Sequence, residues 1–304
     1  MTSITIHVPA TSANIGTGYD TLGIALNLFN SFELELNGAG FSLESDSPIA
    51  DDMRVICGKM CEVCANHFFQ RSNAEPRGVS FRIENRVPIA RGLGSSATLR
   101  IAIMEGLNRL LKLGVGAAHI VQWASELEGC TDNAAAAYYG GFTASGVVNG
   151  RLRCYKAEVP ETIDFVAVSP HAEVETDKAR IIFSPEVLRE DAVHNLSHGI
   201  LLSMAFAQGE WDAVGDLMDD RLHQPQRQAN IPALKPLYDV INAAREAGAL
   251  GAYLSGSGST MMAMTLRNKE QVAAAMQDAV AKHGLEFETR FLKADNHGTR
   301  VDNI

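Results

Sequence analysis

Apolar side chains alternate with polar ones at a period of two in some segments of the first half of the chain and recur at helical spacing in others. The period of two predicts strands at residues 3–8, 31–36, 79–84, 142–148, 151–157 and 163–169. Helical spacing predicts helices at residues 52–69, 95–113 and 116–128. It also predicts a short Ala-rich helix with Asp132 as its cap, which ends at Gly140-Gly141.

Helices dominate the pattern in the second half. They are predicted at residues 186–207, 210–221, 231–247 and 268–282, with strands near 250–254, 259–265 and 285–292. Because helices and strands follow one another in mixed order, the pattern indicates an α+β fold. We expect a domain boundary near residues 155–165, with an N-terminal domain of residues 1–158 and a C-terminal domain of residues 159–304. The two domains are expected to share a cleft.

Composition narrows the class of protein. The chain has 304 residues, of which 46% are hydrophobic, which is enough for a large core in one or two domains. Its net charge of −10 argues against a nucleic-acid or anionic-membrane partner. The first eight residues alternate like a strand and have no apolar core, and no apolar run approaches the roughly 18–20 residues of a membrane span. We therefore expect a cytoplasmic protein.

The chain has five cysteines, which is consistent with a reducing cytoplasm in which they stay as free thiols. Cys57, Cys61 and Cys64 lie on one face of a predicted helix, with His67 nearby. A metal site is one interpretation of this cluster, but three cysteines on one stripe more often line a core.

The chemically most informative segment runs from Val87 to Ala97. Gly92, Gly94, Ser95 and Ser96 stand between an extended segment and a predicted helix. The glycines allow close approach of the backbone to a ligand, and the free N–H groups of the helix attract an anion. A phosphate site is the functional interpretation, and a tight turn with a serine N-cap is the alternative.

Two familiar phosphate loops fit this segment less well. A Walker A loop needs a lysine, and none occurs between Lys59 and Lys112. The spacing of the six residues from Gly92 to Ala97 fits a relaxed dinucleotide fingerprint. However, the predicted helix is followed by another helix instead of the strand that a βαβ unit needs, so a dinucleotide fold is disfavoured.

Two further loops are rich in small polar residues. The first, from Pro9 to Asp20, contains Asn14 and leaves a strand, so it can bind a small polar substrate or form a capped turn. The second, Ser255-Gly256-Ser257-Gly258, lies between two apolar strands and is either a flexible hairpin or a second ligand loop.

Three such loops in this order resemble the GHMP kinase superfamily, and within it the homoserine kinases, over essentially the whole chain. The first loop resembles the substrate loop of that family, and the last its C-terminal glycine loop, which supports the active site. The central loop resembles the family's ATP phosphate loop, here Pro88, Arg91, Gly92, Leu93, Gly94, Ser95, Ser96 and Ala97.

Smaller motifs extend the resemblance. Residues 128–133, Glu-Gly-Cys-Thr-Asp-Asn, are similar to the family's Glu-Gly-His-Pro-Asp-Asn. Residues 176–180 look like its Thr-x-x-Ala-Arg, and residues 220–232 resemble its second arginine segment. The two arginine segments distinguish an amino-acid substrate from mevalonate or a sugar.

The resemblance implies a set of site residues. ATP would bind with Mg²⁺ on Ser96, or Ser95, and on Glu128, with Glu126 as the second choice of carboxylate. Asp132 and Asn133 would lie at the attacking hydroxyl as the catalytic pair, and whether Asp132 acts as a base is left open.

The resemblance also implies the substrate, L-homoserine, which carries an ammonium group, a carboxylate and a hydroxyl. Arg180 and Arg227 would bind the carboxylate, since a guanidinium matches it bidentately. Asn14 and Asp20 would bind the ammonium, and Thr176 would add a hydroxyl contact.

The implied fold has an N-terminal ribosomal-protein-like domain with a left-handed βαβ crossover and a C-terminal ferredoxin-like domain. The implied activity is phosphorylation of L-homoserine for threonine synthesis.

Three departures from the family pattern bear on this activity: Cys130-Thr131 replaces His-Pro, Ser259 replaces a proline, and residues 53–56 lack an expected asparagine at the adenine site. The alternatives are a kinase for another small hydroxy-acid or amino alcohol, and a non-catalytic nucleotide sensor. The oligomeric state is open, with a homodimer as one option.

Overall fold

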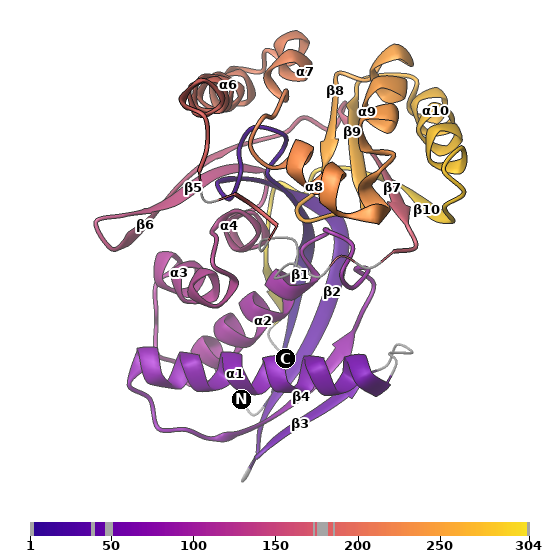
Figure 1. The fold of residues 1–304 in the computed structure, drawn as a ribbon. Helices are drawn as coiled ribbons and strands as arrows, with labels where there is room; N and C mark the ends of the chain where they lie inside the picture. Colours follow the sequence, from indigo (N-terminus) through magenta and orange to yellow (C-terminus); the bar gives the residue numbers. More distant parts are fainter. Residues whose placement is uncertain are drawn as a thin grey trace.

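A computed structural model describes residues 3–37, 40–45, 51–172, 174, 182–184 and 186–302, with side chains from Arg54 onward in the first helix. The fold is α+β, as predicted, and is built on two sheets (Figure 1). Among the described residues, none of the helices combines the length and the apolar character of a membrane span.

The first sheet has seven strands, in the order β11-β1-β2-β4-β3, and a hairpin of β5 and β6 that joins β2. Their bounds are β1 (Ser3–Ala13), β2 (Leu22–Asn37), β3 (Phe41–Ser45), β4 (Gly78–Glu84), β5 (Phe142–Val148), β6 (Arg151–Ala157) and β11 (Arg300–Asp302). Among the described strands of this sheet, only β3 and β4 pair in parallel, and a helix connects them.

Four helices cover one face of this sheet (Figure 1). They are α1 (Asp51–Ser72), α2 (Ser95–Leu110), α3 (Ala117–Glu128) and α4 (Asp132–Tyr139). Alternate residues of β1, namely Ile4, Ile6 and Val8, are buried in the core that these helices complete. The period-two and helical patterns of the sequence therefore meet in one apolar layer.

The second sheet is antiparallel, in the order β10-β7-β9-β8. Its elements are β7 (Asp164–Pro170), α9 (Leu237–Glu246), β8 (Gly251–Leu254), β9 (Met261–Thr265), α10 (Lys269–Ala281) and β10 (Phe287–Leu292). This β-α-β-β-α-β order agrees with the expected ferredoxin-like domain. Val166 and Val168 face α9 and α10, whereas Phe165 and Ala167 face α6 (Arg189–Gln208) and β2.

The predicted helices at residues 210–221 and 231–247 are wrong in extent. The chain forms short pieces instead: η1 (Trp211–Ala213), α7 (Val214–Leu217), α8 (Gln224–Asn230) and η2 (Pro232–Leu234), before α9. The carboxylate of Asp220 accepts hydrogen bonds from the backbone N–H groups of residues 222–224, which turns the chain. Pro232 and Pro236 then interrupt the helical pattern, since proline has no N–H to donate.

The end of the chain returns to the first sheet. The N–H of Asp295 donates to the carbonyl of Ala25, and its own carbonyl accepts from Gly141. Strand β11, which the sequence pattern did not predict, pairs with β1. The proposed division at residue 158 falls between β6 and β7 and stays a prediction.

Candidate active site

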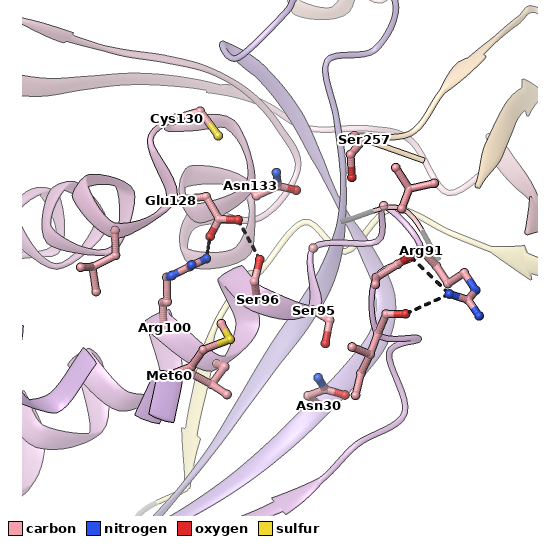
Figure 2. Close-up of a pocket in the computed structure, with 18 of the residues that line it drawn as sticks. Asn30, Met60, Arg91, Ser95, Ser96, Arg100, Glu128, Cys130, Asn133 and Ser257 are labelled. Atoms are coloured by element: carbon pink, nitrogen blue, oxygen red, sulfur yellow. Dashed lines mark hydrogen bonds and ion pairs between the residues drawn. The ribbon is translucent and has the colours of Figure 1, made fainter. Parts of the chain in front are cut away.

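A cavity of about 540 Å³ lies where the three polar loops meet, within the size range of small-molecule sites (Figure 2). Most of its polar lining comes from the three loops, from residues 128–133 and from α8. The residues concerned are Asn14, Asp20, Arg91, Gly92, Gly94, Ser95, Ser96, Glu128, Cys130, Asp132, Asn133, Arg227, Gly256 and Ser257.

The central loop needs its glycines for two separate reasons. Gly92 and Gly94 have φ values of 74° and 68°, in the left-handed region that other residues rarely adopt. A Cβ on Gly92 would lie 2.1 Å from the carbonyl oxygen of Ser255, and one on Gly94 would lie 1.9 Å from Oγ1 of Thr11. Side chains are thus excluded by both dihedral angle and space.

The alternative of a serine N-cap is wrong. Gly94 is the N-cap of α2, and no side chain caps that helix, while Ser95 and Ser96 lie within its first turn. The N-terminal end of α2 and both serines border the cavity. Because the first N–H groups of a helix attract anions, the cavity has a phosphate-binding end.

Hydrogen bonds tie the three loops into one unit. The hydroxyl of Ser255 donates to the carbonyl of Gly92 at 2.7 Å and lies 2.8 Å from the hydroxyl of Ser12. The N–H of Thr11 donates to the carbonyl of Leu93 at 3.1 Å. The C-terminal loop is therefore an integral support of the phosphate end and not a flexible hairpin.

Asn14 shapes the first loop. Its Nδ2 donates to the carbonyl of Gly256 at 3.1 Å, and its Oδ1 accepts from the backbone N–H of Asp20 at 3.0 Å. Asn14 and Asp20 both have positive φ, at 70° and 59°. The amide of Asn14 thus holds the turn that brings Asp20 to the cavity.

Ser96, Arg100 and Glu128 form a polar group on one wall (Figure 2). The hydroxyl of Ser96 donates to Oε1 of Glu128 at 2.7 Å, and Arg100 forms an ion pair with the other carboxylate oxygen. Arg100 was not among the residues predicted from the sequence. It lies one helical turn after Ser96, so the i, i+4 spacing on α2 was the available signal.

The second-choice carboxylate, Glu126, lies elsewhere. It bonds to His67 at 3.0 Å and to Arg71 at 2.9 Å, and it does not line the cavity. Cys61 and Cys64 are buried in the core of the first sheet, where burial raises the pKa of both thiols. Two of the three cysteines on the stripe are therefore core residues, and the half-buried Cys57 packs against them.

One group within the described ranges brings three metal-competent atoms together. Asp20, Cys130 and Asp132 present a carboxylate oxygen or a sulfur within 4.8 Å of one another. All three line the cavity. Cys130, in place of the family histidine, thus borders the site between two carboxylates.

The start of α4 presents the predicted catalytic pair. Oδ1 of Asp132 accepts from the backbone N–H of Asn133 at 2.7 Å, and Oδ1 of Asn133 accepts from the hydroxyl of Thr11 at 2.7 Å. Asp132 is buried yet lines the cavity. The predicted cap is one residue off, because Thr131 is the N-cap and Asp132 lies in the first turn of the helix.

Arg227 brings a positive charge to the same cavity. It is buried on α8, and its guanidinium donates to the carbonyl of Gly256 at 2.7 Å and to Nδ1 of His223 at 3.1 Å. The rings of Tyr19 and Phe183 lie 5.7 Å and 5.2 Å from it. This aromatic contact stabilises the charge while the side chain faces the cavity.

His223 holds the guanidinium of Arg227 in place. It is fully buried, stacks on Tyr19 at 5.2 Å between ring centroids and reaches the carbonyl of Gly16 at 2.8 Å. Burial is the main cause that lowers its pKa to about 4, and Arg227 adds to the effect, while Asp220 opposes it. The imidazole is therefore neutral at pH 7.

The remaining wall of the cavity is apolar. Its side chains come from β2, α1, β4, α2 and α3: Phe32, Ile56, Cys57, Met60, Ile83, Leu99 and Leu127. An apolar slot beside a phosphate end suits a flat heteroaromatic base. This wall was not predicted from the sequence, in which residues 53–56 lack the asparagine expected at the adenine site.

Other predicted residues lie outside the lining. Leu93 and Ala97 are buried in the core, and Pro88, Ser255 and Gly258 are not on the wall. Thr176 and Arg180 lie outside the described residues.

Two protein-family models match this chain, one in each half. The family described as GHMP kinases N terminal domain matches residues 58–141, and that described as GHMP kinases C terminal matches residues 203–284. A homoserine kinase of Moorella thermoacetica is 36% identical over 97% of this chain and 99% of its own.

Solved structures agree with these matches. A homoserine kinase from Cytophaga hutchinsonii has a TM-score of 0.84 at 26% identity, covering 99% of this chain and 98% of the other. A mevalonate kinase from L. major has a TM-score of 0.69 over 95% of both chains, and at 15% identity it speaks for the fold alone.

Proposed function

The chain belongs to the GHMP kinases and, within them, to the homoserine kinases, and we propose that it transfers the terminal phosphoryl group of ATP to the side-chain hydroxyl of L-homoserine. The product is O-phospho-L-homoserine, the substrate for threonine synthesis. One observation carries the assignment to this cavity: the N-terminus of α2 and the buried Arg227 of α8 face the same 540 Å³ space, and the C-terminal glycine loop bonds to both sides.

We propose that the central loop binds the phosphates of ATP. Phosphoryl transfer depends on positioning and on neutralising charge more than on covalent chemistry. The backbone of residues 92–96, the dipole of α2 and the hydroxyl of Ser95 supply donors toward the cavity. The apolar wall around Met60 and Leu99 would receive the base.

Mg²⁺ fits the pair Ser96 and Glu128. Their oxygens lie 2.7 Å apart on the cavity wall, and Mg²⁺ prefers oxygen ligands of this kind. When bound, the ion supplies positive charge to the phosphates. Arg100 holds one oxygen of Glu128, which orients the other toward Ser96.

The part of the cavity around Arg227 suits the amino-acid part of the acceptor. Arg227 would bind the carboxylate of L-homoserine, and its contacts to His223 and Gly256 hold the guanidinium in place. Asn14 and Asp20 would bind the ammonium, Asp20 directly and Asn14 through the turn it stabilises. Arg180 and Thr176 remain proposed contacts.

The acceptor hydroxyl would lie at the start of α4. Asn133 is held by Thr11 and by Asp132, so its amide is oriented before substrate binds. Asp132 is the carboxylate best situated to receive the hydroxyl proton. Its hydrogen bond from the N–H of Asn133 holds the carboxylate in place on the cavity wall.

A coupled assay of ADP release with Mg-ATP tests the function. We expect turnover with L-homoserine and little with L-threonine, L-serine, mevalonate or galactose. Turnover on another of these acceptors would keep the phosphate chemistry but overturn the assignment of the Arg227 pocket. Nucleotide binding with no turnover on any acceptor would favour a sensor.

A further inference from the structure

Three buried hydroxyl groups form a hydrogen-bonded line that ends on the central loop. Oη of Tyr253 lies 3.0 Å from Oγ of Ser12, which lies 2.8 Å from Oγ of Ser255. The hydroxyl of Ser255 then donates to the carbonyl of Gly92 at 2.7 Å. All three hydroxyl-bearing side chains are fully buried. This hydroxyl network, from Tyr253 to Gly92, joins β8 of the second sheet to the end of β1 and to the loop before α2.

The direction of every bond in the hydroxyl network follows from its last acceptor. A hydroxyl group has one hydrogen to donate, and a carbonyl oxygen can only accept. Ser255 gives its hydrogen to Gly92, so towards Ser12 it can only accept. Ser12 has then used its own hydrogen, so it accepts from Tyr253. Tyr253 is therefore the first donor, and the aligned bonds polarise and strengthen one another.

The hydroxyl network sets the orientation of one peptide group in the central loop. The carbonyl of Gly92 is directed toward Ser255, a buried residue that does not line the cavity. Because a peptide group is planar and trans, the N–H of Leu93 points to the opposite side of the same peptide. The next peptide is held separately, since the carbonyl of Leu93 accepts from the N–H of Thr11 at 3.1 Å.

This orientation matters because a phosphate attracts a backbone N–H and repels a carbonyl oxygen. A glycine has no Cβ to restrict its dihedral angles, so the peptide after Gly92 can rotate more readily than that of any other residue type. Rotation would exchange the N–H of Leu93 for a carbonyl oxygen at the phosphate end. The hydrogen bond from Ser255 opposes this rotation, and Ser12 and Tyr253 strengthen that bond from the other side.

We propose that Tyr253 is a positioning residue for the phosphates of ATP, which acts through Ser12 and Ser255 on the carbonyl of Gly92. This role rests on the proposed function, in which the central loop binds ATP. Tyr253 does not line the cavity, so it acts through the other members of the hydroxyl network. A phenylalanine would fill the same space in β8, so the role of Tyr253 in the site belongs to a single hydroxyl group.

Calorimetric titration of the full chain with Mg-ATP, with no acceptor present, tests the hydroxyl network. We expect Tyr253→Phe to raise the dissociation constant of Mg-ATP by about fivefold, and Ser255→Ala by about tenfold, because each removes a hydrogen bond. The KM for L-homoserine should not change in either variant. Ser169→Ala is the matched control, because Ser169 and Thr260 form a buried hydroxyl pair at 2.7 Å outside the network. It should bind Mg-ATP like the unaltered protein.

A double substitution shows whether Tyr253 acts through Ser255. Once Ser255→Ala has removed the bond to Gly92, the hydroxyl of Tyr253 has no remaining connection to the central loop. Adding Tyr253→Phe should then weaken the binding of Mg-ATP no further. Full additivity of the two effects would mean that Tyr253 acts by another route, and it would overturn the proposal.

The possible outcomes separate this role from the proposed function. An unaltered protein that does not bind Mg-ATP would overturn both. Binding by the unaltered protein, with the same dissociation constant for Tyr253→Phe, would overturn the role of Tyr253 alone. An equal weakening in Ser169→Ala would also overturn it, because that result would reflect a general loss of packing. A KM for homoserine that rises as much as the dissociation constant of Mg-ATP would have the same meaning.

Discussion

Nδ1 of His223 lies 3.1 Å from the guanidinium of Arg227 and accepts a hydrogen bond from it. Because a guanidinium only donates, the ring proton must be on Nε2, which donates to the carbonyl of Gly16 at 2.8 Å. One neutral imidazole thus joins the first loop to the arginine of α8. Neither ring nitrogen is left to touch the substrate, so we regard His223 as a positioning residue.

Two substitutions test the two hydrogen bonds of His223 one at a time. His223→Gln retains a donor that can reach Gly16 but has no acceptor at the Nδ1 position, whereas His223→Asn retains that acceptor. We expect His223→Gln to raise the KM for homoserine by about tenfold, because it leaves a buried N–H donor of Arg227 without an acceptor. His223→Asn should raise this KM less. Steady-state kinetics that show equal changes in the KM for ATP, or the reverse order of the two variants, would contradict this role.

Stability should fall in mild acid because of the same residue. Burial lowers the pKa of His223 to about 4, below its ordinary value of 6.5, so the unfolded chain binds a proton that the folded chain does not. The contribution is fully present above pH 6.5 and is lost as the pH falls toward 4, by up to about 3 kcal/mol. Urea unfolding at pH 7.5 and pH 5 measures it. His223→Asn should flatten this dependence, and an unchanged slope would refute the assignment.

Arg227→Lys should damage binding of the acceptor and spare ATP. An ammonium cannot match a carboxylate with two parallel bonds as a guanidinium does, so we expect the KM for homoserine to rise by about a hundredfold. The KM for ATP should change little. Arg221→Lys is the control, because Arg221 belongs to the same segment but pairs with Asp191 at the surface. Similar effects of both variants would remove the carboxylate role from Arg227.

Gly92→Ala tests the contact between the two glycine loops. Its Cβ would meet the carbonyl of Ser255, whereas Gly114 has a similar φ of 67° but open space around it. Gly114→Ala should therefore lower the free energy of unfolding by only about 1 kcal/mol, through backbone strain. Gly92→Ala should lower it clearly more and should also cause a large loss of kcat. Denaturant unfolding compares the two variants. Equal losses of stability would mean that the loops are not tightly packed.

Glu128→Gln should raise the Mg²⁺ concentration needed for half-maximal activity by about tenfold, because a neutral amide is a weaker ligand than a carboxylate. Glu126→Gln is the matched control, since Glu126 lies two residues away but is paired with His67 and Arg71. Activity titrated with Mg²⁺ at fixed ATP distinguishes them. A Mg²⁺ requirement that shifts for Glu126 and not for Glu128 would reverse our assignment.

The sequence was sufficient for the local features of this site. Gly92 and Gly94 stand directly before a strong helical pattern, so the phosphate end follows from dihedral preference and helix polarity alone. Asn14 and Asp20 are likewise close in sequence, and the loop between them closes on itself. Each of these inferences needs only a few consecutive residues.

Features that depend on distant contacts could not be predicted in this way. The apolar wall gathers Phe32, Ile56 and Leu127 from separate elements, and no spacing links them. Strand β11 has only three residues, too few for a period of two to appear. The helix predicted at 210–221 ends early because the carboxylate of Asp220 accepts hydrogen bonds from backbone N–H groups. Helical periodicity carries no information about such bonds.

The pairing of β1 with β11 has a consequence for synthesis on the ribosome. Strand β1 is translated almost three hundred residues before β11, which pairs with its outer edge. That edge of the first sheet therefore stays bare while the intervening residues are made. For this interval the nascent chain carries an unpaired strand edge, the feature through which proteins aggregate.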